Sequence, residues 1–168
     1  MPTSYAIAVV IHVLAAFVWV GGVLTIGAVA LPAARQLPDE QRRAAVSAIA
    51  RRFRPIGWSA LLVLLVSGFY MISHWGATFA NLANLEFFAI DRAKPVGVKL
   101  ILIALMLVTS GLHDWWVGPE ASRLAKEGEE ERADTWRRWA ALLGVLTGLL
   151  VIGIVLVATV VARPWIVF

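Results

Sequence analysis

Four long apolar runs divide this chain, and shorter polar stretches separate them. The runs cover residues 5–31, 56–75, 96–117 and 139–162. A helix needs about 20 apolar residues to cross the roughly 30 Å hydrocarbon core of a bilayer. Helices satisfy their own backbone hydrogen bonds in lipid, whereas four strands cannot close into a barrel. The pattern therefore predicts an all-α, integral membrane four-helix bundle that forms a single transmembrane domain over residues 1–168.

The first run also has features of a signal peptide, because Ala28, Val29 and Ala30 form a small-residue cleavage box. However, it has no basic region before it, and it is longer than the apolar core of a signal peptide. We therefore expect it to remain in the protein as the first span.

The distribution of basic residues predicts the orientation. Eleven of the 15 lysines and arginines lie between spans one and two or between spans three and four. The positive-inside rule places these two loops in the cytoplasm and both termini on the outer, periplasmic side of a bacterial-type inner membrane. The basic charge is thus explained by topology, which excludes nucleic acid as its partner and leaves the lipid bilayer. The eleven are Arg35, Arg42, Arg43, Arg51, Arg52, Arg54, Arg123, Lys126, Arg132, Arg137 and Arg138.

Composition supports the membrane assignment and excludes several chemistries. The 168 residues are 60% hydrophobic and 15% charged, with a mean hydropathy of +0.79. Soluble domains are about 45–50% apolar and about 25% charged. The chain has no cysteine, so it cannot form disulfides, thiolate metal sites, iron–sulfur clusters or a thiol nucleophile.

Two features between and within the spans leave alternatives open. Residues 38–53 have apolar positions at helical spacing with arginines opposite, which fits either a separate amphipathic helix or a cytoplasmic extension of span two. Gly144 and Gly148 form a small-residue pair on span four, which fits helix packing inside the bundle or a homodimer face. The acidic stretch 127–131 is expected to be a solvated turn. The sequence shows no internal repeat.

Four ionisable residues fall within the spans, where such residues are costly and often functional. They are His12, His74, Lys99 and His113. At 1.5 Å per residue, His12 lies roughly 12 Å and Lys99 roughly 6 Å from the outer surface, and His74 lies close to it. We therefore expect His12, His74 and Lys99 to gather in the outer half of the bundle, with His113 near the cytoplasmic end.

A neutral imidazole on facing helices suits the axial ligation of haem b, which needs no cysteine. His12 is the expected ligand, with Lys99 as the second ligand and His74 as its substitute. Trp19 lies seven residues from His12 on the same helical face, where its ring could line one side of a flat cofactor. Two bis-histidine haems need four histidines, and the chain has three, so one haem is the maximum.

Copper is the rival cofactor. Met71 and His74 are three residues apart and share a helical face. A thioether together with imidazoles suits copper, so His12, His74 and Met71 form a candidate metal-ligand set. A third hypothesis is a structural or assembly subunit without a cofactor.

Three segments resemble the CopD-like and HemJ-like membrane proteins. They are His12 to Gly22 (HVLAAFVWVGG), Arg51 to Pro55 (RRFRP) and Val98 to Leu100 (VKL). HemJ-like proteins are haem-b protoporphyrinogen oxidases in which a first-span histidine and a third-span lysine are important. That resemblance implies roles for His12 and for Lys99 as a catalytic residue. CopD-like proteins are associated with copper transport or resistance.

The main functional hypothesis is therefore a haem-b-binding redox protein, either an oxidoreductase resembling HemJ-type protoporphyrinogen oxidase or a small b-type cytochrome. It implies a porphyrin substrate or electron transfer to a membrane redox partner. The alternative is a CopD-like copper transport or resistance protein without catalysis.

Overall fold

The structure, a computed structural model, describes residues 3–74, 76, 78 and 94–162. All ordered elements among these residues are helices, and none is a strand. The chain divides into two compact units, Met1–Ala83 and Asn84–Phe168. The all-α fold class is confirmed. The single transmembrane domain stays a prediction, because it concerns how these two units combine.

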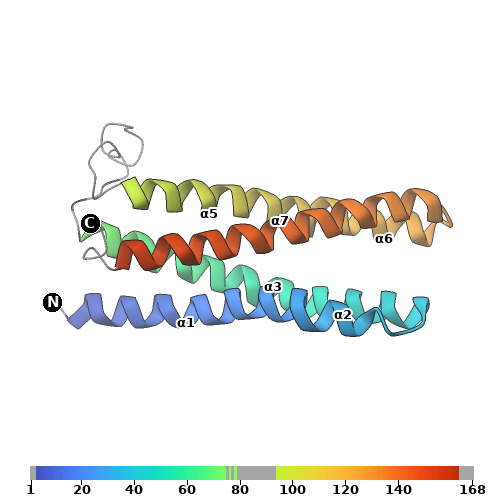
Figure 1. Cartoon of the computed structure of the whole chain (residues 1–168), viewed down its shortest axis with the longest axis horizontal. Coiled ribbons are helices and arrows are strands. Elements are labelled where there is room, and N and C mark those ends of the chain that lie inside the picture. Colours follow the sequence, from blue (N-terminus) through green and yellow to red (C-terminus); the bar gives the residue numbers. More distant parts are fainter. Residues whose placement is uncertain (1–2, 75, 77, 79–93, 163–168) are drawn as a thin grey trace. The chain divides into compact units, whose positions relative to one another are not determined.

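Unit 1 is a hairpin of two antiparallel helical stretches (Figure 1). The first stretch runs through α1 (Thr3–Thr25), a π-helical turn η1 (Ile26–Ala30) and α2 (Leu31–Ala34). The second is α3 (Asp39–Ser73). Residues at alternating three- and four-residue spacing form the line along which α1 and α3 meet, which we call the α1–α3 seam. In register with the contacts of Tyr5 with His74, His12 with Ser67 and Gly22 with Phe53, its positions are Tyr5, Ala8, His12, Ala15, Trp19 and Gly22 on α1, and Phe53, Gly57, Ala60, Leu64, Ser67, Met71 and His74 on or directly after α3.

Small residues let the two helices of unit 1 approach closely. A Cβ at Gly22 would overlap with the ring of Phe53, and a Cβ at Gly57 would lie 3.2 Å from the same ring. The Phe53 ring therefore occupies space that two glycines leave open. The alternating spacing of three and four residues along the seam is typical of left-handed helix packing.

The basic segment before span two is part of one long helix. α3 begins at Asp39 and continues through Pro55 to Ser73. The structure thus shows a helical extension of span two and not a separate amphipathic helix at residues 38–53. Pro55 removes one backbone donor from the helix, but 35 residues remain helical across it.

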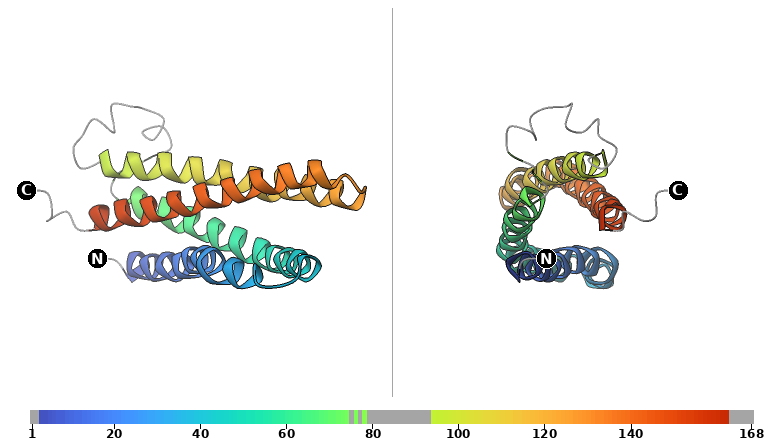
Figure 2. Two further views of the ribbon diagram at one scale, coloured as in Figure 1. Left: turned by 45° about the vertical axis from the view of Figure 1, so that its right-hand side comes forward. Right: turned by 90° about the vertical axis from the view of Figure 1, so that its left-hand side faces the viewer.

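Unit 2 is a second antiparallel hairpin (Figure 2). Its first stretch comprises α5 (Lys94–Leu112), a π-helical turn η3 (His113–Val117) and α6 (Gly118–Lys126). Its second is α7 (Glu130–Ala162). Gly128 joins them with a φ of 81°, a conformation that glycine adopts without a steric cost. The acidic turn predicted at residues 127–131 is confirmed for residues 127–129, whereas Glu130 and Glu131 already belong to the first turn of α7.

Four helical stretches are long and apolar enough to cross a membrane, so the prediction of four spans is confirmed. Each stretch is longer than the apolar run that predicted it, because polar flanking residues continue the helix. The orientation of the termini stays a prediction. The four stretches are Thr3–Ala34, Asp39–Ser73, Lys94–Lys126 and Glu130–Val161.

The Gly144 and Gly148 pair has open space around it. A Cβ at either glycine would meet no atom within 4 Å among the described residues. Within unit 2, α7 therefore does not pack closely on a neighbouring helix at this pair, and packing of the pair inside a four-helix bundle stays a prediction. Its use as a homodimer face stays a prediction.

Candidate functional site

His12 lies on the α1–α3 seam and is half-buried. Its Nδ1 is 2.9 Å from Ser67 Oγ, and Ser67 Oγ is 2.5 Å from the carbonyl oxygen of Val63. A serine hydroxyl has one proton to donate, and the shorter contact takes it to Val63. His12 Nδ1 therefore donates to Ser67, which leaves the lone pair of the neutral ring on Nε2.

The His12 ring also packs tightly on the backbone of α3. A Cβ at Gly68 would lie 3.2 Å from Cε1 of His12, so Gly68 provides the space in which the ring fits. Ser67 and Gly68 together fix the position and the tautomer of His12. Neither residue was among the candidates from the sequence, although Ser67 is a polar residue seven positions before His74 on the same helical face.

His74 caps the C-terminal end of α3 and is exposed. Its Nδ1 is 3.0 Å from the carbonyl oxygen of Tyr70. A carbonyl oxygen only accepts hydrogen bonds, so Nδ1 is again the donor and Nε2 carries the lone pair. The ring lies 4.5 Å from the Tyr70 ring and 5.4 Å from the Tyr5 ring, measured between centroids.

Met71 lies between the two histidine positions on the seam. It is half-buried, four residues after Ser67 and three before His74. Ser67 and His74 are seven residues apart on the helix, which is roughly 10 Å of rise. Unit 1 therefore arranges an imidazole, a thioether and a second imidazole along one line of helix contact that ends at an exposed histidine.

Trp19 is the largest buried side chain on the α1 face that carries His12, with 4% of its surface exposed. It lies one heptad from His12, as its spacing predicts. Its burial fits a packing residue of the seam. Its contact with a cofactor stays a prediction.

The remaining candidates belong to unit 2. Lys99 lies on α5 and is half-buried. His113 begins the π-helical turn, and its Nδ1 is 2.9 Å from Asp114 Oδ1. Of the expected cluster of His12, His74 and Lys99, the structure thus places the two histidines in one unit and the lysine in the other.

The side chains on the α1–α3 seam that could hold a metal are two imidazoles and a thioether. Within residues 3–74, 76, 78 and 94–162 there is no group of three or more His, Cys, Asp or Glu side chains that could hold a metal. Imidazole and thioether ligands without a carboxylate favour copper over calcium, magnesium or manganese.

These features define the class: a multi-pass, all-helical membrane protein with histidine and methionine side chains on one helix–helix seam. The family model described as copper resistance protein D matches residues 47–159, more than half of the 168-residue chain. The chain belongs to that family. The match includes Met71, His74, Lys99 and His113, and it begins after the helix that carries His12. The CopD-like resemblance predicted from sequence is confirmed.

A curated relative is similar over most of its length. It is an uncharacterized protein of Aquifex aeolicus (strain VF5), 26% identical over 143 residues, which are 84% of this chain and 86% of the relative. No solved structure matches the chain.

Proposed function

We propose that this protein handles copper in the membrane, with the copper ion as cargo and without catalysis. The observation that carries the proposal is shared by two histidines of unit 1. His12 and His74 both give their Nδ1 proton to an oxygen of α3. Metal-binding histidines are commonly oriented in this way, since a hydrogen bond at one ring nitrogen directs the other toward the metal.

Met71 determines which metal fits. A thioether is a soft, uncharged ligand that favours Cu(I). A half-buried site of imidazoles and a thioether adds no negative charge to the apolar span, so it suits a monovalent ion better than a divalent one. Exposed His74 would receive the ion, and Met71 and half-buried His12 would bind it further along the α1–α3 seam.

We further propose that this seam opens toward the periplasm. The charge bias of the chain favours a bacterial inner membrane, with both termini outside. His74 follows the end of α3 that lies away from the basic segment, so in this orientation it faces the periplasmic surface. Copper would then enter from the periplasmic side.

The test is copper binding by the full-length protein in detergent under reducing conditions. We expect His12→Gln, Met71→Leu and His74→Gln each to lower the copper bound per chain, measured by elemental analysis after dialysis against a Cu(I) chelator. Leucine and methionine have similar volumes, so Met71→Leu removes the sulfur with little change in packing.

Unit 2 offers a matched control for each ligand type. His113→Gln removes a histidine with the same kind of Nδ1 hydrogen bond. Met106→Leu removes a methionine that is only 2% exposed. Both variants should retain the copper content of the parent protein. A loss in the controls equal to that in the unit 1 variants would contradict the assignment.

The haem b hypothesis is tested on the same sample. Axial ligation by His12, with Lys99 or His74, predicts a Soret band that disappears in His12→Gln and is unchanged in Met71→Leu. A Soret band that corresponds to one haem per chain would contradict the copper proposal and support the redox function. If the protein binds neither haem nor copper, the remaining hypothesis is a structural or assembly subunit without a cofactor.

A further inference from the structure

The α3 helix carries three arginines at the point where it enters the membrane. Arg51, Arg52 and Arg54 lie just before the apolar run that begins at Ile56. Arg51 and Arg52 are exposed, and Arg54 is half-buried. The arginines of this helix end outnumber its carboxylates, because Arg35, Arg42, Arg43, Arg51, Arg52 and Arg54 share the segment only with Asp39 and Glu40.

Among the residues that the structure describes, no carboxylate forms an ion pair with Arg51, Arg52 or Arg54. Arg51 donates to Ser47 Oγ at 3.0 Å, an uncharged partner. Arg54 Nε is buried and has no hydrogen-bond partner among the described residues. Leaving a buried donor of a charged group without an acceptor is costly, so Arg54 has a donor that can bind an acceptor which the described residues do not provide.

The residues around Arg54 have the order of groups that a phospholipid needs. Ser47, Arg51, Arg54, Trp58, Leu62 and Leu65 follow one another at helical spacing of three or four residues. These residues therefore share one face of α3. Leu62 and Leu65 are 63% and 40% exposed. Going into the membrane, this face presents cationic groups, an indole and then an apolar stripe.

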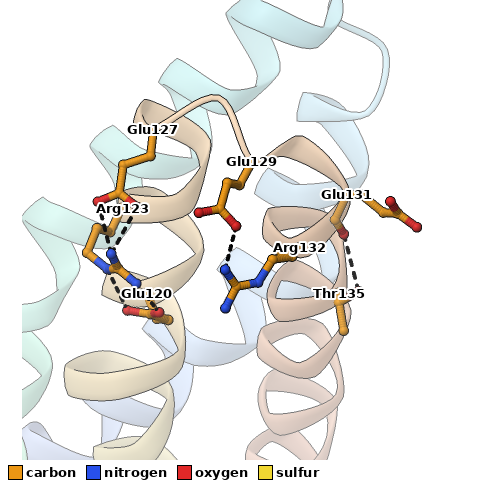
Figure 3. A network of polar contacts seen from close by, with 7 residues as sticks. All are labelled: Glu120, Arg123, Glu127, Glu129, Glu131, Arg132 and Thr135. Carbon is orange, nitrogen blue, oxygen red and sulfur yellow. Dashed lines mark hydrogen bonds and ion pairs between the residues drawn. The ribbon is translucent and has the colours of Figure 1, made fainter.

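In unit 2, by contrast, arginines near the ends of α6 and α7 are paired with carboxylates. Arg123 contacts Glu120 at 2.6 Å and Glu127 at 2.9 Å, and Arg132 contacts Glu129 at 2.5 Å (Figure 3). These arginines already have anionic partners. The difference between the two helix ends therefore lies in pairing as well as in the number of arginines.

We infer that the face of α3 formed by Arg51, Arg54, Trp58, Leu62 and Leu65 binds an anionic phospholipid. Arg51 and Arg54 hold the phosphodiester headgroup, since guanidinium groups match the geometry of phosphate oxygens. Trp58 lies at the level of the interface, where tryptophan is favoured. The acyl chains lie along Leu62 and Leu65. Because the arginines adjoin the apolar span, a membrane lipid fits this face better than a soluble phosphate.

The test is selective lipid retention by the full-length protein. The protein is incubated in detergent with equal amounts of phosphatidylglycerol and phosphatidylcholine, repurified, and its retained lipids are quantified by mass spectrometry. We expect phosphatidylglycerol to be enriched. A basic residue near an anionic surface contributes about five-fold in binding, so Arg51→Gln/Arg54→Gln should lower this enrichment on the order of 20-fold.

Three comparisons make the result decisive. Arg51→Lys/Arg54→Lys retains the charge and should keep most of the enrichment. Arg123→Gln/Arg132→Gln removes two paired arginines and should leave the enrichment unchanged. Helicity is checked by far-ultraviolet circular dichroism, and if the double glutamine variant is not helical, Arg54→Gln alone should still lose about five-fold. Equal enrichment in parent and glutamine variants, or an equal loss in the unit 2 control, would overturn the inference.

Discussion

Unit 1 has a π-helical turn at Ile26–Ala30 with Pro32 just beyond it, and unit 2 has one at His113–Val117 with Pro119 just beyond it. Both turns are followed by a short helix, a break and one long return helix. Counted from the start of each π-helical turn, His12 and Lys99 both lie fourteen residues earlier. The two hairpins therefore share one backbone plan, which places a histidine and a lysine at equivalent positions.

The side chains on this shared plan differ in chemistry. In unit 1, the helix contact contains His12, Ser67 and Met71, and it ends at His74. In unit 2, the equivalent contact is formed by fully buried Met106 and by Thr147, which donates to Thr109 at 3.2 Å. The proposed copper ligands thus all lie in one hairpin, while the helix contact of the other is formed by apolar packing and a hydroxyl pair. The proposed copper handling therefore depends on side chains of unit 1 and not on the backbone plan that both hairpins share.

We expect the largest effect on stability at the α1–α3 seam, where glycines leave space for the ring of a neighbouring side chain. Gly22→Leu would force a side chain into the space of the Phe53 ring, which already lies against Gly57. We expect a loss of about 3 kcal/mol in unfolding free energy, at the upper end for overpacked sites. Thermal or sodium dodecyl sulfate unfolding followed by circular dichroism measures it.

The neighbouring glycine supplies the control. A Cβ at Gly21 would meet no atom within 4 Å, so Gly21→Leu should leave the unfolding free energy unchanged or raise it slightly, because glycine disfavours helices. If Gly21→Leu were as destabilising as Gly22→Leu, close helix contact at the seam would not be the cause.

Much of the fold could be predicted from sequence, because span length and apolar character are local properties. All four spans follow from runs of about 20 apolar residues. The helix ends could not be predicted, since the polar residues before Ile56 and after Val117 continue helices beyond the apolar runs. The shared plan of the hairpins was also missed. It appears in backbone features, the π-helical turns, while equivalent residues such as Trp19 and Met106 are unlike.

The candidate site was predicted only in part. His12, Met71 and His74 stand out because polar or soft residues are uncommon in apolar spans. Ser67 does not stand out, because serine is frequent in membrane helices and its role depends on which residue of α1 faces it. That register comes from Gly22 against Phe53 and from Tyr5 against His74, contacts between residues distant in sequence.

Ser67 gives the next largest effect. Ser67→Ala removes the acceptor that holds Nδ1 of His12, so His12 can change tautomer and rotate. Loss of such a supporting partner typically lowers metal affinity 10- to 100-fold. Copper affinity measured by competition with a Cu(I) chelator should fall by this amount. Thr109→Ala, which removes a buried hydroxyl from unit 2, should leave the affinity unchanged, and an equal loss would show a general effect on folding.

The hydroxyl pair of unit 2 should contribute less. Thr147→Val keeps the shape of the side chain but removes its hydrogen bond to Thr109. Hydrogen bonds between membrane helices average about 0.6 kcal/mol, so the unfolding free energy should fall by about that amount. Thr159→Val is the comparison, because Thr159 is exposed and donates only to Leu156 of its own helix. A loss above about 2 kcal/mol in Thr147→Val would mean that the pair supports more of unit 2 than one hydrogen bond can.

The smallest effect on copper binding is expected for a substitution of Lys99 in unit 2. Lys99 is equivalent to His12 in backbone position, but the copper proposal gives it no role. Lys99→Met should therefore leave the copper content and the Cu(I) affinity at the parental values, whereas His12→Gln lowers both. A matched loss in Lys99→Met would mean that equivalent positions of the two hairpins act on the same ion. A Soret band lost in both variants would instead support the haem ligation that the HemJ-like resemblance implies, because a lysine can ligate haem iron but has little preference for Cu(I).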